Sequence, residues 1–386
     1  MQFTPELIHN KVYMSQALSF DAMAEVKTEA GSMPMGAFIQ ENGDILFRLN
    51  LPKAKEVYIH VSVSRKVFED VVLEKKSGGY FEGTLFFREN LTGPANVSVY
   101  VDGVETLISE LPIIWGGCHP ANNVEIPDPE ADYLLIRDVP HGALTRELFW
   151  SNSIGNWERC MVYTPPGYQK SGESYPVLYL QHGGGDNEMM WEYVGRVSSI
   201  MDNLIADGKA VPFIIVMCNA MLRSGGKVGF PVDKAYEKML IEDCIPFIEE
   251  TYRVKTGKWN RAIAGLSMGS FMTSDIAFGN PDVFGYIGNF TAGMTRGDLQ
   301  MTYEHPWKAL MAKGAEYFAS QYKVYFRSTT PQEDHLEYFE ADDAICAEAG
   351  VDKLPCYHRT LYPPRTAKWN SWRMGLRDYA QLIFRD

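Results

Sequence analysis

This chain of 386 residues shows two different patterns of hydrophobic and polar positions, one in each half. From residue 36 to about residue 115, short apolar stretches alternate with polar positions at a period of two, and Asn-Gly, Gly-Gly and Asp-Gly pairs separate them. The expected strands cover residues 45–49, 57–61, 71–73 and 97–101. Period-two strands joined by such turns predict a small all-β, immunoglobulin-like sandwich.

After residue 138 the pattern changes to apolar strands with little polar alternation, separated by helical periods. The expected strands cover residues 161–163, 177–180, 213–217, 263–264, 286–290, 324–327 and 357–361. The expected helices cover residues 197–207, 234–252, 268–278, 336–349 and 372–384. Apolar strands that are each followed by a helix predict a mostly parallel α/β sheet covered on both faces, with its site at the carboxyl ends of the strands.

These patterns predict four segments. Residues 1–35 combine a weak helical period with a Gly- and Pro-containing loop at 31–36 and are interpreted as a leader segment. Residues 36–115 form the β-sandwich. Residues 116–137, rich in Gly, Pro and Asn, are interpreted as a linker, and residues 138–386 form the α/β domain.

A Gly-x-Ser-x-Gly motif, centred on Ser267, stands where an expected strand meets an expected helix. This motif places the serine on a tight turn, and its glycines are needed because a Cβ would clash with the neighbouring strand and helix. The N terminus of the following helix then favours developing negative charge near Ser267. We interpret Ser267 as a nucleophile, with a Gly-rich turn of no catalytic role as the alternative.

A second glycine run follows the strand at 177–180 and begins at Gly183. We expect the backbone N–H groups of Gly183 and Gly184, together with that of Met268, to form an oxyanion hole. A plain Gly-rich turn is the alternative. His182 precedes the glycines, so we interpret it as an anchor of the loop rather than as the base.

The acid of a catalytic triad on this architecture follows the nucleophile in sequence. Asp334 stands after the strand at 324–327 and just before the helix at 336–349, so it is the predicted acid. A helix N-cap is the alternative role, because Asp is preferred there. Glu333 is the fallback candidate for the acid.

The serine motif and the glycine run belong to a longer set of stretches that resembles a known family. It rests on Asp138-Val139-Pro140-His141-Gly142 and on residues 162–168, 175–185, 202–206, 245–249 and 262–269. The second half resembles carbohydrate esterase family 1, the feruloyl and acetylxylan esterases, and the related enterochelin-esterase-like proteins. Residues 45–49 and 52–57 resemble the glycogen-binding-like β-sandwich that often precedes such esterases.

The resemblance implies an α/β-hydrolase domain that needs no metal and no cofactor. It implies a serine carboxylesterase that forms an acyl-enzyme on Ser267. The implied substrates are feruloyl or acetyl esters of xylan-derived saccharides. Trp191 and Trp369 are the predicted aromatic wall for the substrate, with core packing as the alternative, and core packing is the expectation for Trp372.

One position departs from the family's pattern. Such esterases carry their histidine in a Gly-x-His-x-Trp-x-x-Trp segment, and the matching stretch at 363–373 retains both tryptophans but has Ala367 in place of the histidine. Losing a triad member costs many thousand-fold in rate, because the serine then lacks an acceptor for its proton. An engineered change, a natural loss, and recruitment of His358 or His335 are the three explanations.

The missing histidine leaves two other functions open. One is a binding pseudoenzyme that keeps the substrate site without turnover, and the other is an acyltransferase on the same fold. On the β-sandwich, most of the aromatic residues Tyr58, Tyr80, Phe81 and Tyr100 are expected in the core, with a sugar-stacking surface as the alternative.

Composition narrows the partners. A formal charge of −13 argues against nucleic acid and anionic membranes. No apolar stretch approaches the roughly 20 residues of a membrane span, and the first residues lack the order of a signal peptide, so a cytoplasmic protein is expected. The six cysteines lack CxxC and CxxH spacing, which favours buried thiols over disulfides or a zinc site. They are Cys118, Cys160, Cys218, Cys244, Cys346 and Cys356.

Overall fold

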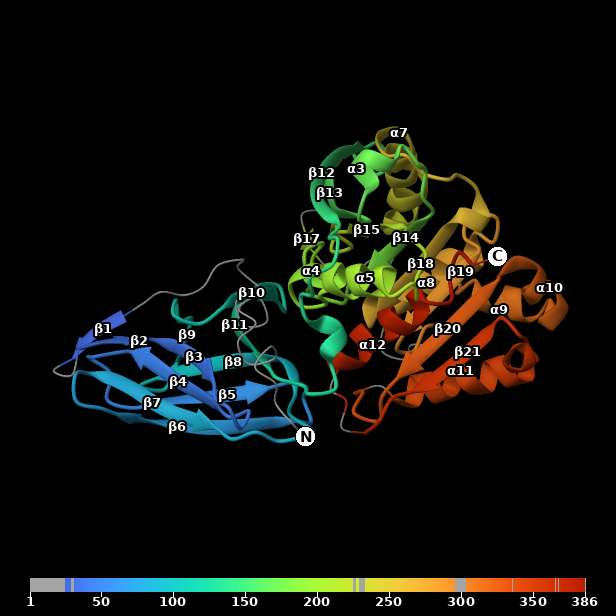
Figure 1. Ribbon diagram of the computed structural model, residues 1–386. Helices are drawn as coiled ribbons and strands as arrows, with labels where there is room; N and C mark the ends of the chain where they lie inside the picture. Colours follow the sequence, from blue (N-terminus) through green and yellow to red (C-terminus); the bar gives the residue numbers. More distant parts are fainter. Residues whose placement is uncertain are drawn as a thin grey trace. The chain divides into compact units, whose positions relative to one another are not determined.

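The computed structural model describes residues 25–28, 31–224, 227–228, 233–295, 303–334, 336–364, 366 and 368–385 (Figure 1). The chain divides into two compact units. One comprises Met1–Arg137 and Pro363–Asn370, and the other comprises Asp138–Tyr362 and Ser371–Asp386. The short segment near the carboxyl end that packs with the first unit is not predicted by the sequence.

The first unit contains an antiparallel sheet of nine strands in the order β10-β11-β8-β5-β6-β7-β4-β3, with β9 paired to β8. Strand β6 pairs with β5 through residues 68–73 and with β7 through Glu74 and Lys75, so it passes from one group of strands to the other. The strands are β3 (Gly36–Ile39), β4 (Ile45–Asn50), β5 (Val57–Ser62), β6 (Phe68–Lys75), β7 (Tyr80–Leu85), β8 (Gly93–Val101), β9 (Val104–Thr106), β10 (Ile113–Gly116) and β11 (His119–Ile126).

Alternate side chains of these strands form the core of the first unit. In β5, Val57, Ile59 and Val61 are buried, so Tyr58 between them points outward. It stacks on Tyr100 with ring centroids 4.6 Å apart. Tyr80 and Phe81 are buried. The expectation that most of the four aromatic residues lie in the core is therefore wrong for the cross-strand pair, because the pleat places both rings on the outer face.

The interpretation of residues 116–137 as a linker is wrong for residues 119–126, which form strand β11. Strand β11 pairs with β8 over five positions, and Val124 and Ile126 are buried. The Asn-rich composition hid the strand because Asn122 has a structural role. Its side chain binds the backbone N–H of Ile108 at 2.8 Å and the backbone carbonyl of Ile108 at 2.7 Å. Residues 132–134 form a 3₁₀ turn, η1 (Asp132–Leu134).

The predicted loop at 31–36 is also partly a strand. Strand β1 (Glu25–Thr28) pairs with β2 (Gly31–Pro34) in an antiparallel hairpin. Residues 1–24 and 29–30, on which the weak helical period of the leader falls, lie outside the described residues.

The second unit contains a sheet of eight strands in the order β12-β13-β15-β14-β18-β19-β20-β21. Strand β12 pairs with β13, and β13 with β15, in the antiparallel orientation. Each remaining pair of neighbours, from β15 along the sheet to β21, is parallel. The strands are β12 (Ala143–Ser151), β13 (Asn156–Thr164), β14 (Val177–Gln181), β15 (Ile214–Cys218), β18 (Arg261–Leu266), β19 (Tyr286–Phe290), β20 (Val324–Thr329) and β21 (Tyr357–Leu361).

The strand order reverses at β14. The chain passes from β14 to β15 on one side, then places β18 on the other side of β14. In open α/β sheets, ligands bind outside the carboxyl ends of the strands at such a switch point. Strands β14, β15 and β19 are buried at every position, which explains their continuous apolar runs. The loops that follow β14 and β18 are therefore the place to look for a site.

The predicted helices are present with shifted ends. The helix expected at 234–252 is continuous but widens into a π-helix, η2, in its middle. The final helix begins four residues earlier than expected and ends earlier. Counting α6, η2 and α7 as one continuous helix, the longer helices are α5 (Val197–Ala206), α6 (Ala235–Lys238) with η2 (Met239–Cys244) and α7 (Ile245–Thr251), α8 (Met268–Gly279), α10 (Gly314–Gln321), α11 (Leu336–Glu348) and α12 (Lys368–Ala380).

Shorter elements complete the second unit. They are α3 (Tyr168–Ser171), α4 (Met190–Tyr193), β16 (Arg223–Ser224), β17 (Lys227–Val228), η3 (Lys258–Asn260), α9 (Trp307–Met311) and η4 (Val351–Lys353). Within the described part of the chain, none of the helices combines the length and the apolar character that crossing a membrane requires.

Candidate active site

Ser267 occupies a strained turn between β18 and α8. It follows Leu266 and precedes Met268 with φ 49° and ψ −118°. Residues that carry a Cβ rarely adopt a positive φ, and such exceptions concentrate at functional sites where the surrounding structure holds them. A strand, a sharp turn that carries serine, and a helix together form a nucleophile elbow. The turn therefore has the form that the sequence predicts, and the nucleophilic role of Ser267 stays a prediction.

The two glycines of the motif are required by close packing around this turn. A Cβ at Gly265 would lie 2.5 Å from the backbone carbonyl carbon and oxygen of Gly269. A Cβ at Gly269 would lie 2.6 Å from the backbone oxygen of His182 and 2.7 Å from Cβ of Gln181. Most of these contacts are with backbone atoms, which cannot move aside as a flexible side chain can.

The glycine loop after β14 lies against Ser267. Strand β14 pairs with β18 in parallel, with Gln181 opposite Gly265, so both loops leave the same edge of the sheet. A Cβ at Gly183 would lie 3.5 Å from Cβ of Ser267 and 2.8 Å from Cδ1 of Leu266. The structure therefore brings together Ser267 and Gly183, which the sequence assigns to the nucleophile and to the oxyanion hole.

The other two predicted donors differ in their surroundings. Met268 is the first residue of α8, and the first N–H groups of a helix have no partner within the helix. Gly184 is exposed beside the buried Gly183. The backbone N–H of Met268 is thus next to Ser267 and available in principle to an oxygen bound there. The oxyanion role of Gly183, Gly184 and Met268 stays a prediction.

His182 anchors the loop and does not have the properties of a catalytic base. Its Nε2 accepts a hydrogen bond from the backbone N–H of Ala220 at 2.9 Å, so the proton lies on Nδ1, which donates to the carbonyl oxygen of Gly183 at 2.7 Å. Burial lowers the pKa of His182 to about 4. Both ring nitrogens are therefore engaged, and the imidazole is neutral at neutral pH.

Two groups in this loop, the buried His182 and the half-buried Asp186, have opposite effects on the pH dependence of stability. Burial raises the pKa of Asp186 to about 7, with a smaller opposing effect from a hydrogen bond with the backbone of Gly183. Its folded-state pKa is raised, so its contribution to stability is present at low pH and is lost as pH rises toward 7. The folded-state pKa of His182 is depressed, so its contribution is lost as pH falls from 6.5 toward 4.

We expect His182→Gln to isolate the histidine contribution, because Asp186 is unchanged in the variant. The free energy of unfolding of the native chain minus that of the variant should fall by about 2–3 kcal/mol between pH 7.5 and pH 4.5. Urea unfolding at the two pH values measures this difference. A difference that does not change with pH would show that His182 titrates normally in the folded protein.

Polar side chains that sequence reasoning missed hold the elbow in place. Asn289 in β19 donates to the backbone oxygen of Ser270 at 2.7 Å and accepts from the hydroxyl of Ser274 at 3.1 Å, which fixes the first turns of α8 against the sheet. The hydroxyl of Tyr236 donates to the side-chain oxygen of Gln181, at the end of β14. A single polar residue inside an apolar strand is the sequence signal that marks Asn289 and Gln181.

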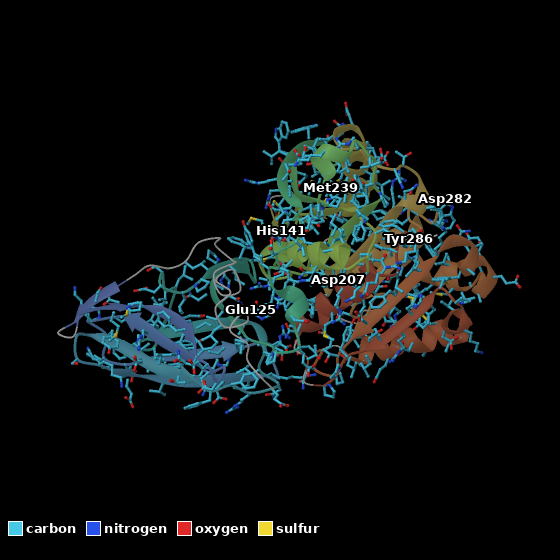
Figure 2. The ribbon with its side chains drawn as sticks, viewed as in Figure 1. Glu125, His141, Asp207, Met239, Asp282 and Tyr286 are labelled. Atoms are coloured by element: carbon cyan, nitrogen blue, oxygen red, sulfur yellow. The ribbon has the colours of Figure 1, made fainter. Side chains whose placement is uncertain are left out.

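Three motifs of the resemblance are hydrogen-bonded to one another in the second unit. Asp202 in α5 accepts hydrogen bonds from Nδ1 of His141 at 2.9 Å, from the backbone N–H of Gly142 at 2.9 Å and from the hydroxyl of Tyr163 at 2.6 Å. Figure 2 labels His141 among the side chains of the chain. A Cβ at Gly142 would lie 2.4 Å from the ring of Tyr163. These motif residues therefore serve to dock α5 on the sheet.

Asp334, the predicted acid, lies five residues beyond the end of β20 and is half-buried. Its backbone N–H donates to Oε1 of Glu333 at 3.0 Å. Glu333 is almost fully buried, and its other oxygen accepts from the hydroxyl of Thr291 at 3.0 Å. Glu333 thus fastens this loop to the loop after β19, which gives it a structural role. Asp334 stays the predicted acid.

A second buried carboxylate shapes the loop after β19. Asp342 in α11 accepts hydrogen bonds from the backbone N–H groups of Gly293, Met294 and Thr295 at 2.6 to 2.9 Å. The guanidinium of Arg327 lies 3.6 Å from the same carboxylate and is also fully buried. Three backbone donors and one cation satisfy this buried charge, so the loop is held in one conformation.

His358, one of the two histidines considered as a replacement for the missing base, is not placed at the carboxyl ends of the strands. His358 is the second residue of β21, so it lies about 10 Å along the strand from the carboxyl end. Burial lowers its pKa. Its position argues against the recruitment of His358. His335 and Ala367 lie outside the described residues.

A histidine–carboxylate pair does exist elsewhere in the second unit. Nδ1 of His305 lies 3.0 Å from both carboxylate oxygens of Asp275, and this hydrogen bond is the main reason that the pKa of His305 is raised. Asp275 stands eight residues beyond Ser267, about 12 Å along α8. The pair is therefore too far along the helix to serve Ser267.

The prediction that Trp191 lines the substrate site is wrong in this structure. Trp191 is 1% exposed, its Nε1–H donates to the backbone oxygen of Gln181 at 2.8 Å, and its ring packs edge-on against Phe290. It supports the end of β14 from within the core, because its indole N–H binds the carbonyl oxygen of Gln181. Trp372 is buried, as expected. Trp369 is half-buried in the first turn of α12, and its role stays a prediction.

The fold and the serine turn define the class of this protein. Two solved structures share the fold: a ferulic acid esterase from Anaeromyces mucronatus in complex with ferulic acid and the enterobactin esterase of Shigella flexneri. The first is 21% identical, covers 67% of this chain and 96% of that one, and has a TM-score of 0.56. The second is 14% identical, covers 89% of this chain and 94% of that one, and has a TM-score of 0.61. These neighbours are esterases of the α/β-hydrolase type.

Sequence comparison identifies the family. The family model described as putative esterase matches residues 151–351, just over half of the chain. This chain belongs to that esterase family. It is 36% identical over 267 residues to an endo-1,4-beta-xylanase/feruloyl esterase of Xylanibacter ruminicola. It is 35% identical over 133 residues to the esterase Rv1288 of Mycobacterium tuberculosis.

These relatives are longer proteins. The matches cover 66% and 32% of this chain, but 36% and 26% of the two relatives. The chain thus spans about a third of the xylanase/feruloyl esterase and about a quarter of the mycobacterial esterase.

Proposed function

We propose that this chain hydrolyses carboxylic esters, with Ser267 as its nucleophile. The observation that carries the proposal is the strained turn at Ser267, with φ 49°, against which the glycine loop packs so closely that a Cβ at Gly183 would lie 3.5 Å from Cβ of Ser267. The surroundings tolerate this strain only because Gly265 and Gly269 lack side chains. Membership of the esterase family supports the same chemistry.

The geometry supports an acyl-enzyme route. The Ser267 hydroxyl would attack the ester carbonyl, and the resulting oxyanion would accept hydrogen bonds from the N–H groups of Gly183 or Gly184 and of Met268. The alcohol leaves, and water then releases the acid from Ser267. Asp334 would orient a base, but Ala367 stands where the family carries histidine. Turnover is therefore expected to be slow, at the level that binding and the oxyanion hole sustain by themselves.

We propose feruloyl or acetyl esters of xylan-derived saccharides as the substrates. The relative from Xylanibacter ruminicola is named as a xylanase and feruloyl esterase, and the structural neighbour from Anaeromyces mucronatus is bound to ferulic acid. The shared fold alone does not distinguish a feruloyl group from an acetyl group. We further propose that the first unit is an immunoglobulin-like sandwich of the carbohydrate-binding type, which its two linked groups of strands support.

Hydrolysis assays with methyl ferulate, an aryl acetate and acetylated xylo-oligosaccharides test the proposal. We expect slow but measurable release of acid, which Ser267→Ala reduces to the rate of the buffer. The variant keeps the Cβ and the strained turn, so it removes only the hydroxyl. Activity that is the same in the native chain and in Ser267→Ala would exclude catalysis by this serine.

A binding protein without turnover is the second candidate, and the absence of histidine at position 367 favours it. In that case a feruloylated xylo-oligosaccharide should bind, and no acid should form after prolonged incubation. Calorimetry together with product analysis on the same sample separates the two functions. A measurable turnover number that depends on Ser267 would end this alternative.

A further inference from the structure

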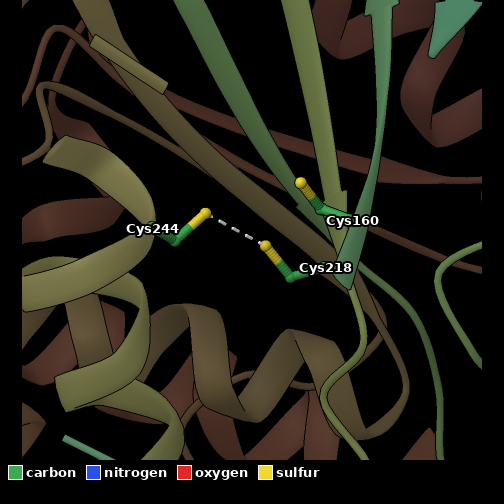
Figure 3. Close-up of side chains that lie close together, drawn as sticks. All are labelled: Cys160, Cys218 and Cys244. Atoms are coloured by element: carbon green, nitrogen blue, oxygen red, sulfur yellow. Dashed lines mark hydrogen bonds between the residues drawn. The ribbon is translucent and has the colours of Figure 1, made fainter. Parts of the chain in front are cut away.

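Three cysteines that are far apart in the sequence meet in the core of the second unit. Cys160 in β13 and Cys218 in β15 face each other as register partners on neighbouring strands, and Cys244 is the last residue of the π-helix η2. Figure 3 shows the three side chains converging from two strands and one helix. The three Sγ atoms lie within 4.8 Å of one another, and those of Cys218 and Cys244 are 3.4 Å apart.

This spacing matches a three-coordinate thiolate site. Three sulfurs bonded at about 2.3 Å to one central atom are about 3.4 to 4.0 Å apart, depending on whether the arrangement is pyramidal or planar. The distance between Cys218 and Cys244 falls in that range, and the other two sulfur pairs, which lie within 4.8 Å, need to approach each other by at most about 1 ångström to reach it. The helix that supplies Cys244 is locally a π-helix, a form that is rare and occurs frequently at functional sites.

The cluster is buried among apolar side chains. All three cysteines are 0% exposed and belong to the main hydrophobic core of the unit, together with Val162, Val216 and Ile263. Glu158 and Glu188 interact with Cys218 over longer range, and Glu188 is paired with Arg159 at 2.5 Å. Each uncompensated charge buried in such a place costs several kcal/mol. An occupant must therefore leave the site nearly neutral.

Charge decides between the thiophilic ions. Three thiolates with Cu⁺ carry a net charge of −2, and with Zn²⁺ a net charge of −1. Zinc in a closed site also takes four protein ligands, and the group found among the described residues has three. A trivalent soft centre such as As(III) gives a neutral product with three sulfurs and needs no fourth ligand. Soft thiolate ligands favour soft centres of this kind.

We propose that Cys160, Cys218 and Cys244 form a binding site for a trivalent thiophile of the arsenite class. Arsenous acid, As(OH)₃, would react with the three thiols. Three As–O bonds and three S–H bonds break, three As–S bonds form, and each thiol proton leaves with a hydroxyl group as water. Arsenic stays trivalent, so the step needs no oxidant, no reductant and no external base.

The cysteine site is separate from the proposed ester-hydrolysis site at Ser267, and two hydrogen bonds connect the segment after Cys218 to the glycine loop. Cys218 ends β15, and Ala220, two residues later, donates its backbone N–H to His182 at 2.9 Å. His182 in turn binds the carbonyl oxygen of Gly183. The inference does not depend on the proposed function, because binding is measured without a substrate.

The test uses the full-length reduced protein, incubated with arsenite for hours because the buried thiols react only after local opening. Native mass spectrometry should show one arsenic added and three hydrogens lost per chain. Refolding in the presence of arsenite gives the same product without the access step. Cys160→Ala, Cys218→Ala and Cys244→Ala should each weaken uptake by at least about 100-fold, because each leaves two sulfurs.

Cys346→Ala is the matched control, since Cys346 is equally buried in the same core but lies outside the cluster. It should take up arsenic as the native chain does. Circular dichroism verifies that each variant is folded. Lack of uptake by both the native and the refolded chain would overturn the proposal. Unchanged uptake in folded Cys218→Ala, or preferential binding of Zn²⁺ or Cu⁺ over arsenite, would overturn it equally.

Discussion

Replacing Ala367 by histidine is expected to raise the esterase activity of this chain by at least two orders of magnitude. The resemblance places the base of the triad at this position, and a positioned general base contributes about 100- to 10,000-fold in rate. The flanking residues Trp369 and Trp372 of the family's segment are retained. The measurement is kcat/KM for methyl ferulate and an aryl acetate, compared between Ala367→His and the native chain.

Two controls separate an acquired base from a change in shape. Ala367→Asn adds a polar side chain of similar reach that cannot act as a base, and it should leave the activity unchanged. The double variant Ala367→His, Ser267→Ala should be inactive, because the base acts only through the serine. A folded Ala367→His protein with no increase in activity would indicate a site remodelled for binding rather than the loss of a single residue.

Gly265→Ala is expected to lower the free energy of unfolding by about 3 kcal/mol, at the upper end of overpacking effects. The added methyl group would lie 2.5 Å from the backbone of Gly269 and 2.9 Å from Cβ of Gln181, so the elbow itself must move. Urea unfolding followed by circular dichroism measures the loss. Any activity that depends on Ser267 should fall in parallel, because the turn and the glycine loop separate.

Gly279→Ala is the matched control at the other end of the same helix, α8. A methyl group there would approach only side chains, with the ring of Pro306 nearest at 3.3 Å. We expect a change within about 1 kcal/mol, as for most substitutions away from such close contacts. If the two substitutions changed the free energy of unfolding equally, the lack of room for a Cβ at Gly265 would not be the reason for the loss.

Local patterns were sufficient to predict the elements that build the site. The strands at 177–180 and 286–290 are mostly apolar because both faces of the sheet are covered, and the structure has them as β14 and β19 with at most one residue of difference. The glycines around Ser267 were predicted for the reason that the structure shows, which is the lack of room for a Cβ. Such requirements act within a few residues, so they leave a signature in the sequence.

Composition misled where a polar residue has an internal partner. The stretch at 119–126 has the Pro and Asn content of a linker, yet it forms β11, since the Asn122 side chain binds the backbone around Ile108 in place of water. Trp191 follows a polar loop, yet it is buried, since its indole N–H finds the carbonyl oxygen of Gln181. Ile108 and Gln181 lie ten or more residues from the side chains that they bind, so no local sequence pattern predicts these contacts.

By itself the sequence determined the strands and helices next to the serine turn, the turn with its glycines, and the departure at Ala367. Only the tertiary structure decided that Gly183 packs against Ser267, that burial and two hydrogen bonds keep His182 neutral, and that Cys160, Cys218 and Cys244 meet. The spacing of the cysteines in sequence argued against a metal site. The physical reason is that hydrophobic periodicity specifies which face of an element is buried, whereas the order of the strands and the docking of η2 specify which buried faces meet.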